Sequence, residues 1–233
     1  MADSIVDLEF VEGDESVAVL TLDDGKANAV SPTLIEEMNA ALDQAEQENC
    51  TLVITGRPGR FSAGFDLSVM SQGGAAMGAL VADGAKLAMR LLTFPQPVVL
   101  ACSGHALAMG ALLCLSCDYR IGVEGEFKIG LNEVAIGMTM PWFGVHLAEY
   151  RLTPAYFNRG VSNAEVFTPE NAVAAGYLDQ LVPSEQLLET AVAVAKGMSG
   201  LNMSAHLGTK LRVRHKLLED MKAGLESEFG DFV

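Results

Sequence analysis

Basic residues are scarce in this 233-residue chain. Lys and Arg together number 15 against 30 Asp and Glu, so the formal net charge is −15. A nucleic-acid partner needs a basic face for its phosphates, and an anionic membrane surface attracts clustered positive charge. The charge balance therefore argues against a nucleic-acid partner and disfavours a membrane surface. It does not exclude a small polyanion, which a few local cations and backbone N–H groups can bind.

A secretory leader and long uninterrupted apolar runs are also missing. The amino terminus carries acidic residues where a signal peptide needs basic ones. The longest apolar stretch, residues 97–117, is interrupted by Ser103, Gly104 and His105. A buried strand followed by a buried helix explains this stretch better than a membrane span. We therefore predict a cytoplasmic protein with no membrane-spanning segment.

The chain has few cysteines and lacks several chemical fingerprints. Its four cysteines lie in apolar sequence, and the single C-x-x-C match, Cys114 to Cys117, has no second pair. The four histidines show no ligand spacing, so no metal site is predicted. Nucleotide-phosphate loops of the types G-x-G-x-x-G and G-x-x-x-x-G-K-[ST] are absent, as is the G-x-S-x-G nucleophile motif. Serine hydrolysis is therefore a weak interpretation.

What the chain does have is alternation of strand-like and helix-like segments. Short apolar runs at residues 52–55 and 98–103 predict buried strands, and residues 31–48 and 80–94 predict amphipathic helices. This order predicts an α/β fold with one core. The last third is mainly helical and ends in a charged amphipathic stretch, residues 209–229.

Two segments suggest a site for a developing negative charge. Residues 59–67 and 104–111 each follow a predicted strand, contain small residues and lead into a helix-prone run. Such a turn leaves backbone N–H groups free at the start of a helix, where partial positive charge collects. Two donors aimed at one oxygen would form an oxyanion hole, whereas the alternative interpretation is two ordinary turns.

The same two segments, F-S-A-G-F-D-L and G-H-A-L-A-M-G-A-L-L-C-L-S-C-D-Y-R-I, resemble the signature segments of the crotonase (enoyl-CoA hydratase/isomerase) superfamily. K-A-N-A-V-S at residues 26–31 and A-V-A-A-G-Y-L-D-Q-L-V at residues 172–182 are similar as well. The resemblance implies a spiral of repeated ββα units over residues 1–190 and a helical trimerisation segment over residues 191–233. It also implies a homotrimer or a dimer of trimers, with apolar runs such as residues 191–195 at the subunit contacts.

The resemblance also implies roles for individual residues. The N–H groups of Phe65 and Met109 would form the oxyanion hole, although the family usually has glycine at the position of Met109. An acyl-CoA substrate would be bound along the segments that match the family's CoA site: Ala27, Ala29, Ser62, Ala63, Asp66, Leu67 and Lys210. Coenzyme A would be part of the substrate, so no separate cofactor is predicted. Residues 72–78 and 138–143 would bound the acyl chain.

The acidic residues decide between reactions. Hydratases of this superfamily use two glutamates, and the position of the first is Leu112 here, while Glu133 matches the second. Moving water on and off a double bond suits two carboxylates, whereas shifting the double bond needs one. The run L-N-E-x-x-x-G-x-x-x-P-W, residues 131–142, is similar to the enoyl-CoA isomerases. A lone carboxyl group in apolar company should also have a raised pKa, as a base for a carbon acid needs.

The sequence therefore predicts an enoyl-CoA isomerase in which Glu133 carries the proton. Three alternatives stay open. One is a hydratase or another crotonase reaction that uses a different acid, such as Asp66 or Glu149. The second is an acyl-CoA-binding protein without catalysis, and the third is a serine thioesterase.

Overall fold

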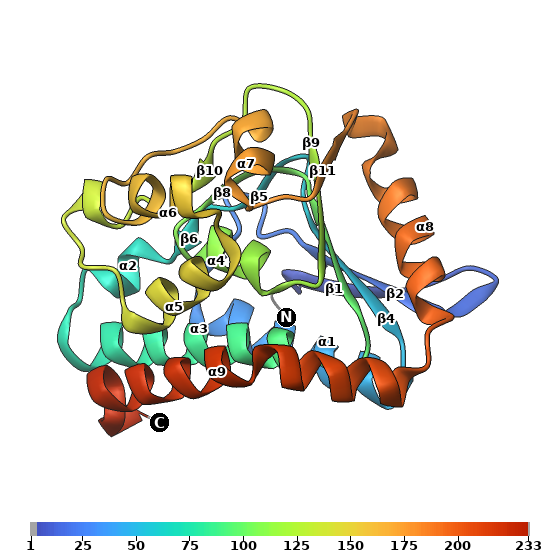
Figure 1. The fold of residues 1–233 in the computed structure, drawn as a ribbon, viewed down its shortest axis with the longest axis horizontal. Coiled ribbons are helices and arrows are strands. Elements are labelled where there is room, and N and C mark those ends of the chain that lie inside the picture. The colour runs from blue at the N-terminus through green and yellow to red at the C-terminus, as the bar shows by residue number, and fades with distance from the viewer. Residues whose placement is uncertain (1–3, 233) are drawn as a thin grey trace.

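A six-stranded, mostly parallel sheet lies at the centre of the structure, a computed structural model that describes residues 4–232 (Figure 1). The first two strands form an antiparallel hairpin, and the later neighbours run parallel. In spatial order the strands are β1 (Val6–Val11), β2 (Asp14–Leu22), β4 (Thr51–Gly56), β7 (Val98–Cys102), β9 (Tyr119–Val123) and β11 (Gln180–Val182). Every residue of β4 and β7 is buried, because both faces of a parallel sheet are covered; this explains their continuous apolar sequence.

Shorter strands form a second layer beside the large sheet. One small sheet has the order β10 (Ile129–Gly130), β8 (Gly104–Leu107) and β5 (Gly59–Ser62), and a further pair joins β3 (Ala29–Val30) to β6 (Gly64–Phe65). The chain passes from β4 to β5 and on to a helix, and then from β7 to β8 and on to the next helix. Each pass adds one strand to the large sheet and one to the small sheet. The predicted α/β fold of repeated ββα units is confirmed.

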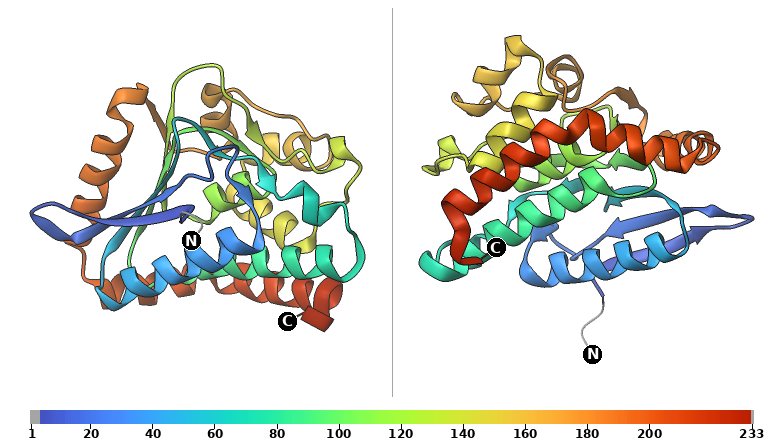
Figure 2. Two further views of the ribbon diagram at one scale, coloured as in Figure 1. Left: turned by 180° about the vertical axis from the view of Figure 1, so that it is seen from behind. Right: turned by 60° about the horizontal axis from the view of Figure 1, so that its bottom comes forward.

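Helices cover both faces of the large sheet (Figures 1 and 2). They are α1 (Pro32–Gln47), α2 (Leu67–Met70), α3 (Gly74–Thr93), α4 (Met109–Ser116), α5 (Trp142–Arg151), α6 (Pro154–Val161), α7 (Pro169–Ala175), α8 (Leu187–Ser199) and α9 (Met203–Phe229), with 3-10 turns η1 (Val134–Ile136), η2 (Ser184–Gln186) and η3 (Gly230–Phe232). Helix α8 packs against β2, β4, β7 and β9, and α9 packs against α3 and α5. Within residues 4–232, no helix is both long and apolar enough to cross a membrane.

Two helix boundaries differ from the sequence prediction. Helix α3 begins at Gly74, inside the glycine-rich stretch, because Gly73 turns the chain with a φ of 61° just before it. The buried helix predicted within residues 97–117 begins only at Met109, because Gly104–Leu107 pairs with β5 and β10 as strand β8. Tertiary pairing thus overrides an apolar pattern that fits a helix equally well.

The predicted boundary after residue 190 falls inside α8, so the structure does not divide the chain there. Ala191 and Ala195, which the sequence assigned to subunit contacts, are fully buried against the large sheet of their own chain. For these two residues the expectation is wrong, because α8 has an apolar partner within the fold. A trimerising role for the remaining C-terminal residues stays a prediction.

A buried ion cluster fixes α9 to the body of the fold. The Lys210 Nζ atom lies 2.7 Å from Asp118 Oδ2 and donates to the Phe94 and Gln96 carbonyl oxygens at 2.9 and 3.1 Å. Arg214 donates to Asp118 Oδ1 at 2.6 Å and to the carbonyl oxygen of Leu92. One carboxylate therefore neutralises two cations that also cap the end of α3. Burial lowers the pKa of Lys210, and Asp118 opposes this effect.

We predict that Asp118→Ala lowers the free energy of unfolding by about 3–5 kcal/mol, because it leaves two buried cations without their counter-ion. Chemical denaturation measures this directly. Asp220→Ala, which removes an exposed i,i+4 ion pair with Lys216, is the matched control and should cost a small fraction of that loss. Equal losses in the two variants would contradict the anchoring role of the cluster.

Candidate active site

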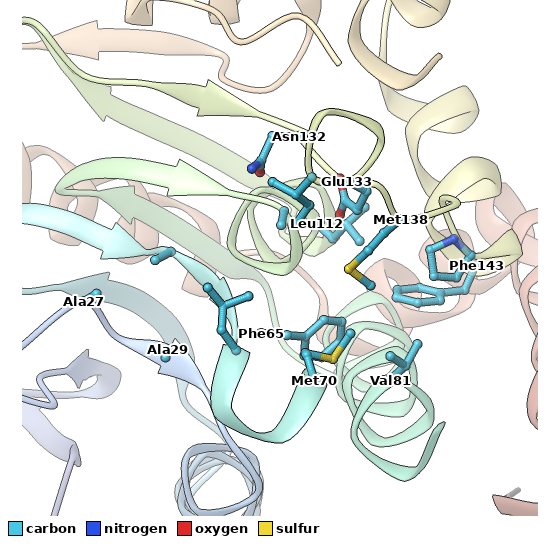
Figure 3. A pocket seen from close by; sticks show the side chains of 15 residues that line it. Ala27, Ala29, Phe65, Met70, Val81, Leu112, Asn132, Glu133, Met138 and Phe143 are labelled. Atoms are coloured by element: carbon cyan, nitrogen blue, oxygen red, sulfur yellow. The ribbon is translucent and has the colours of Figure 1, made fainter. Parts of the chain in front are cut away.

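A cavity of about 330 Å³ lies between β6, α2, α3, the start of α4 and the loop that follows β10. Figure 3 shows the side chains that line it. Only Asn132 and Glu133 among them are polar. The apolar lining consists of Ala27, Ala29, Ala63, Phe65, Leu67, Met70, Val81, Ala108, Leu112, Ile136, Met138, Pro141 and Phe143. An apolar cavity with few polar groups is the usual form of a small-molecule site.

Glu133 supplies the one ionisable group in this lining. Its side chain is 6% exposed, and its Oε2 atom is buried without a hydrogen-bond partner among the described residues. Burial raises the pKa of Glu133 from 4.5 to about 7, and only a backbone hydrogen bond within the residue itself opposes the shift. A carboxyl group with this pKa can take up and release a proton near neutral pH.

The backbone around Glu133 holds this carboxyl group in place. The β10 strand pairs with β8, and the Ala108 N–H donates to the Gly130 carbonyl oxygen at 3.0 Å. The carbonyl oxygen of Glu133 accepts from the N–H groups of Ile136 and Met138 at 3.1 and 2.9 Å. The chain therefore turns through η1 directly after the acid, while the side chain stays free to act in the cavity.

Leu112 lies on α4 and faces the same cavity as Glu133 (Figure 3). The sequence prediction that these two positions share one site agrees with the structure. Leu112 is 1% exposed, and a Cβ atom on Gly144 would lie 3.3 Å from its Cδ1 atom, so α5 closes over this side chain. The position that the sequence analysis matched to the first hydratase glutamate is thus occupied by a tightly packed apolar group.

The Phe65 and Met109 backbones come together as predicted. The Asp66 N–H donates to the Val30 carbonyl oxygen, so the Phe65 N–H points toward the opposite edge of its strand. Met109 is the first residue of α4, where helical N–H groups have no acceptor within the helix. Ala108 precedes it with φ 50° and ψ −124°, a strained conformation of the kind that clusters at functional sites.

Two glycines explain how the oxyanion segments approach each other. A Cβ atom on Gly64 would lie 2.8 Å from Ala108 Cβ and 3.3 Å from the Met109 nitrogen, so only glycine allows this contact. A Cβ atom on Gly84 of α3 would lie 2.5 Å from the Phe65 ring and 3.4 Å from Met109 Cε. The Met109 side chain is therefore buried beside α3.

The predicted CoA-binding residues separate into two groups. Ala27, Ala29, Ala63 and Leu67 line the cavity. Ser62 and Asp66 do not, because their side chains stabilise the local backbone. The Ser62 hydroxyl donates to the Asn28 carbonyl oxygen at 2.7 Å, and Asp66 caps α2 by accepting from the Ser68 N–H at 2.8 Å.

Lys210 is the one predicted CoA residue that lies away from the cavity. Its ammonium group is engaged in the buried cluster with Asp118 and is not available to a ligand in the cavity of the same chain. The prediction for Lys210 is therefore corrected. Lys210 lies near the C-terminus, as CoA contacts of the family do. Its ion-pair partner Asp118 is 92 positions away in the sequence, so no local pattern could have indicated this contact.

A second hollow of about 210 Å³ adjoins the cavity and was not predicted. Ala27 and Ala63 line both, and Arg60, His105 and Lys128 line the hollow. The His105 Nδ1 atom accepts the Lys128 N–H at 2.9 Å, and burial, with Arg60 and Lys128 nearby, lowers the pKa of His105. Three basic residues gather here in a chain of net charge −15. Arg60 directly precedes one signature segment and His105 lies within the other, which is the signal that sequence analysis missed.

The comparisons with known proteins extend over nearly the whole chain. Residues 12–230 match the family model described as enoyl-CoA hydratase/isomerase. A crystal structure of an enoyl-CoA hydratase/isomerase family protein from Pseudomonas syringae superposes with a TM-score of 0.94 at 49% identity, covering 98% of both chains.

Curated relatives carry two kinds of name. Human mitochondrial enoyl-CoA delta isomerase 1 is 28% identical over 93% of this chain and 74% of its own. The 2,3-dehydroadipyl-CoA hydratase of Escherichia coli is 29% identical over 94% of this chain and 86% of its own. Overall similarity therefore does not separate the two reactions, and the residues of the cavity must do so.

We predict that Glu133→Gln stabilises the folded protein at high pH only. The folded pKa of about 7 lies above the unfolded value of 4.5, so the wild-type protein loses stability as pH rises through this interval and the variant does not. The free energy of unfolding of the variant relative to wild type should rise by roughly 2–3 kcal/mol between pH 4.5 and pH 8. Denaturant unfolding at both pH values measures the change, and a difference independent of pH would show that Glu133 is not desolvated.

Proposed function

Because the chain belongs to the enoyl-CoA hydratase/isomerase family, we propose that it shifts the double bond of an enoyl-CoA from the β,γ to the α,β position. The observation that carries this proposal is the single carboxyl group of the cavity. Among the residues that the structure describes, Glu133 is the only ionisable side chain that lines it, and Leu112 occupies the place of a second acid. One group that accepts and returns a proton is sufficient for this reaction.

The arrangement supports the following sequence of steps. The thioester oxygen accepts hydrogen bonds from the Phe65 and Met109 N–H groups. The Glu133 carboxylate removes a proton from the α-carbon, and the electron pair of the broken C–H bond delocalises into a dienolate that these donors stabilise. The protonated Glu133 then returns the proton to the γ-carbon, which leaves the double bond between the α- and β-carbons. No atom is gained or lost.

The pKa of Glu133 suits both halves of this cycle. An ordinary carboxylate is a weak base toward carbon, whereas a group with a pKa of about 7 is a stronger base and is still ionised in a useful fraction of molecules at neutral pH. The apolar lining keeps the protonated acid beside the substrate and excludes the water that would compete for the dienolate.

The alternatives have less support. A hydratase needs a second group to activate water, but Asp66 caps α2 and Glu149 is exposed on α5, so neither lines the cavity. No serine lines it, which disfavours a thioesterase. A non-catalytic binder would gain nothing from a buried, unpaired carboxyl group, which lowers stability.

The basic hollow suits the phosphate-rich end of CoA. With the thioester between Phe65 and Met109, the pantetheine arm would run over Ala27 and Ala63 toward the hollow that these residues share. Arg60 and Lys128 would then attract the phosphates, and this contact would depend on ionic strength. An acidic protein can thus bind a polyanion through a local concentration of cations.

Assembly as a trimer or a pair of trimers is part of the proposal. Its support is the family membership and a set of large apolar side chains that the single chain leaves exposed, namely Val134, Ile136 and Trp142.

The test is the turnover of Glu133→Gln on a β,γ-enoyl-CoA. Glutamine keeps the size of the side chain but cannot take a proton from carbon, so turnover should fall by about 10²–10⁴-fold while the affinity for a saturated acyl-CoA changes little. Glu149→Gln is the control and should keep normal turnover.

Hydration of an α,β-enoyl-CoA is measured beside isomerisation. If the wild-type protein hydrates faster than it isomerises, the proposed reaction is wrong. If a folded Glu133→Gln variant keeps its isomerase activity, the proposed mechanism is wrong.

A further inference from the structure

The cavity continues past the acid on the side away from the CoA arm. In Figure 3, Ala27 and Ala29 lie at one end, and Phe65, Leu112 and Glu133 lie in the middle. Met70 lies beside Phe65, Met138 lies beside Glu133, and Val81 and Phe143 lie at the other end. Together we call Met70, Val81, Met138 and Phe143 the tail compartment. A substrate whose α-carbon meets Glu133 must place the rest of its acyl chain there.

We propose that the tail compartment selects enoyl-CoA substrates with an unsubstituted acyl chain of about six to ten carbons. The proposal rests on the proposed function, and it adds the class of substrate. The size of the cavity limits the length of the acyl chain. The described lining beyond Glu133 offers no polar partner, so the acyl chain must be unsubstituted.

The size of the cavity limits the length of the chain. A methylene group fills about as much space as a water molecule, ~30 Å³, so the whole cavity of about 330 Å³ holds roughly eleven such units. The thioester and the end of the pantetheine arm occupy several of them. The remainder accommodates a chain of medium length, whereas a longer chain must leave the compartment.

The end wall of the compartment is rigid. Phe143 is 1% exposed, and α9 supports its helix from behind. A Cβ atom on Gly224 of α9 would lie 2.5 Å from Trp142 Cβ and 3.7 Å from the Phe143 nitrogen, so the two helices are in direct contact. Val81, 3% exposed on α3, closes the adjoining side. Neither side chain can withdraw without moving a helix.

Met138 is the adjustable part of the wall. It lies in the loop after Gly137, which has a φ of 82°, and its side chain is only partly buried. A methionine side chain is flexible and adapts to what it contacts. Met138 is therefore the residue that determines how many carbons fit at the far end of the acyl chain.

The compartment also excludes charged chain ends. All four of its side chains are apolar, and no Lys, Arg or His lines the cavity. A carboxylate at the end of an acyl chain would have to enter unpaired or be protonated first, and at neutral pH protonation alone reduces binding by roughly 100-fold.

The experiment measures the dissociation constants of saturated acyl-CoAs from four to sixteen carbons by calorimetry, together with octanedioyl-CoA. The wild-type constant should fall stepwise to eight or ten carbons and then level or rise, and octanedioyl-CoA should bind roughly 100-fold more weakly than octanoyl-CoA. Constants that keep falling to sixteen carbons, or equal binding of these two eight-carbon ligands, would overturn the proposal.

Met138→Ala is the variant, and Met89→Ala is its matched control, because Met89 is a partly buried methionine of α3 outside the cavity. The ratio measured is the dissociation constant of dodecanoyl-CoA divided by that of octanoyl-CoA. Met138→Ala should lower this ratio about tenfold relative to wild type, and Met89→Ala should keep it within twofold of the wild-type value. An unchanged ratio in a folded Met138→Ala variant would show that Met138 does not limit the length of the acyl chain.

Saturated ligands do not react, so this result is independent of the isomerase assay. Stepwise binding without isomerisation would contradict the proposed reaction and support the compartment. Isomerisation together with binding that does not depend on chain length would support the proposed reaction and contradict the compartment.

Discussion

The isolation of the Glu133 carboxyl group from water and from any counter-ion is the constraint on which the site depends. The group is 6% exposed and has an unpartnered oxygen, and this burial raises its pKa to about 7. A salt bridge would reduce the free-energy cost of burying the carboxylate, but it would also lower the pKa of Glu133 and make it a weaker base. Leu112, which lines the same cavity, is apolar and supplies no partner for such a salt bridge.

The fold maintains this isolation through backbone contacts far from one another in sequence. The pairing of β8 with β10 places the acid next to the start of α4, whose first N–H groups have no acceptor within the helix. Gly64 allows the two oxyanion segments to touch, and Gly84 allows the Phe65 ring to lie against α3. The cluster of Asp118, Lys210 and Arg214 then fixes α9, which supports the end wall of the tail compartment at Gly224.

The centre of the site could be predicted from the sequence through the family resemblance, because the segments that carry this resemblance are short and continuous. Phe65, Met109, Leu112 and Glu133 each belong to a run whose turn glycines and flanking strands are visible locally. The acyl end could be predicted only in part. Met138, Pro141 and Phe143 of the predicted range 138–143 line the cavity, but residues 72–78 do not, and Val81 and Met70 take their place. Those contacts depend on where α3 begins and how it crosses α4, which a local pattern does not encode. Lys210 shows the same limit, since its partners come from two distant segments of the chain, residues 94–96 and Asp118.

The most direct test of a desolvated carboxylate acting as the base is the pH dependence of kcat/KM for the wild-type protein on a β,γ-enoyl-CoA. This parameter reports the ionisation of the free enzyme, so it should rise with pH and level off with a midpoint near 7. A profile that is flat from pH 5 to pH 9 would show that no such group controls the reaction. A midpoint near 4.5 would show that Glu133 ionises as an ordinary exposed carboxyl group, and either result would contradict this account.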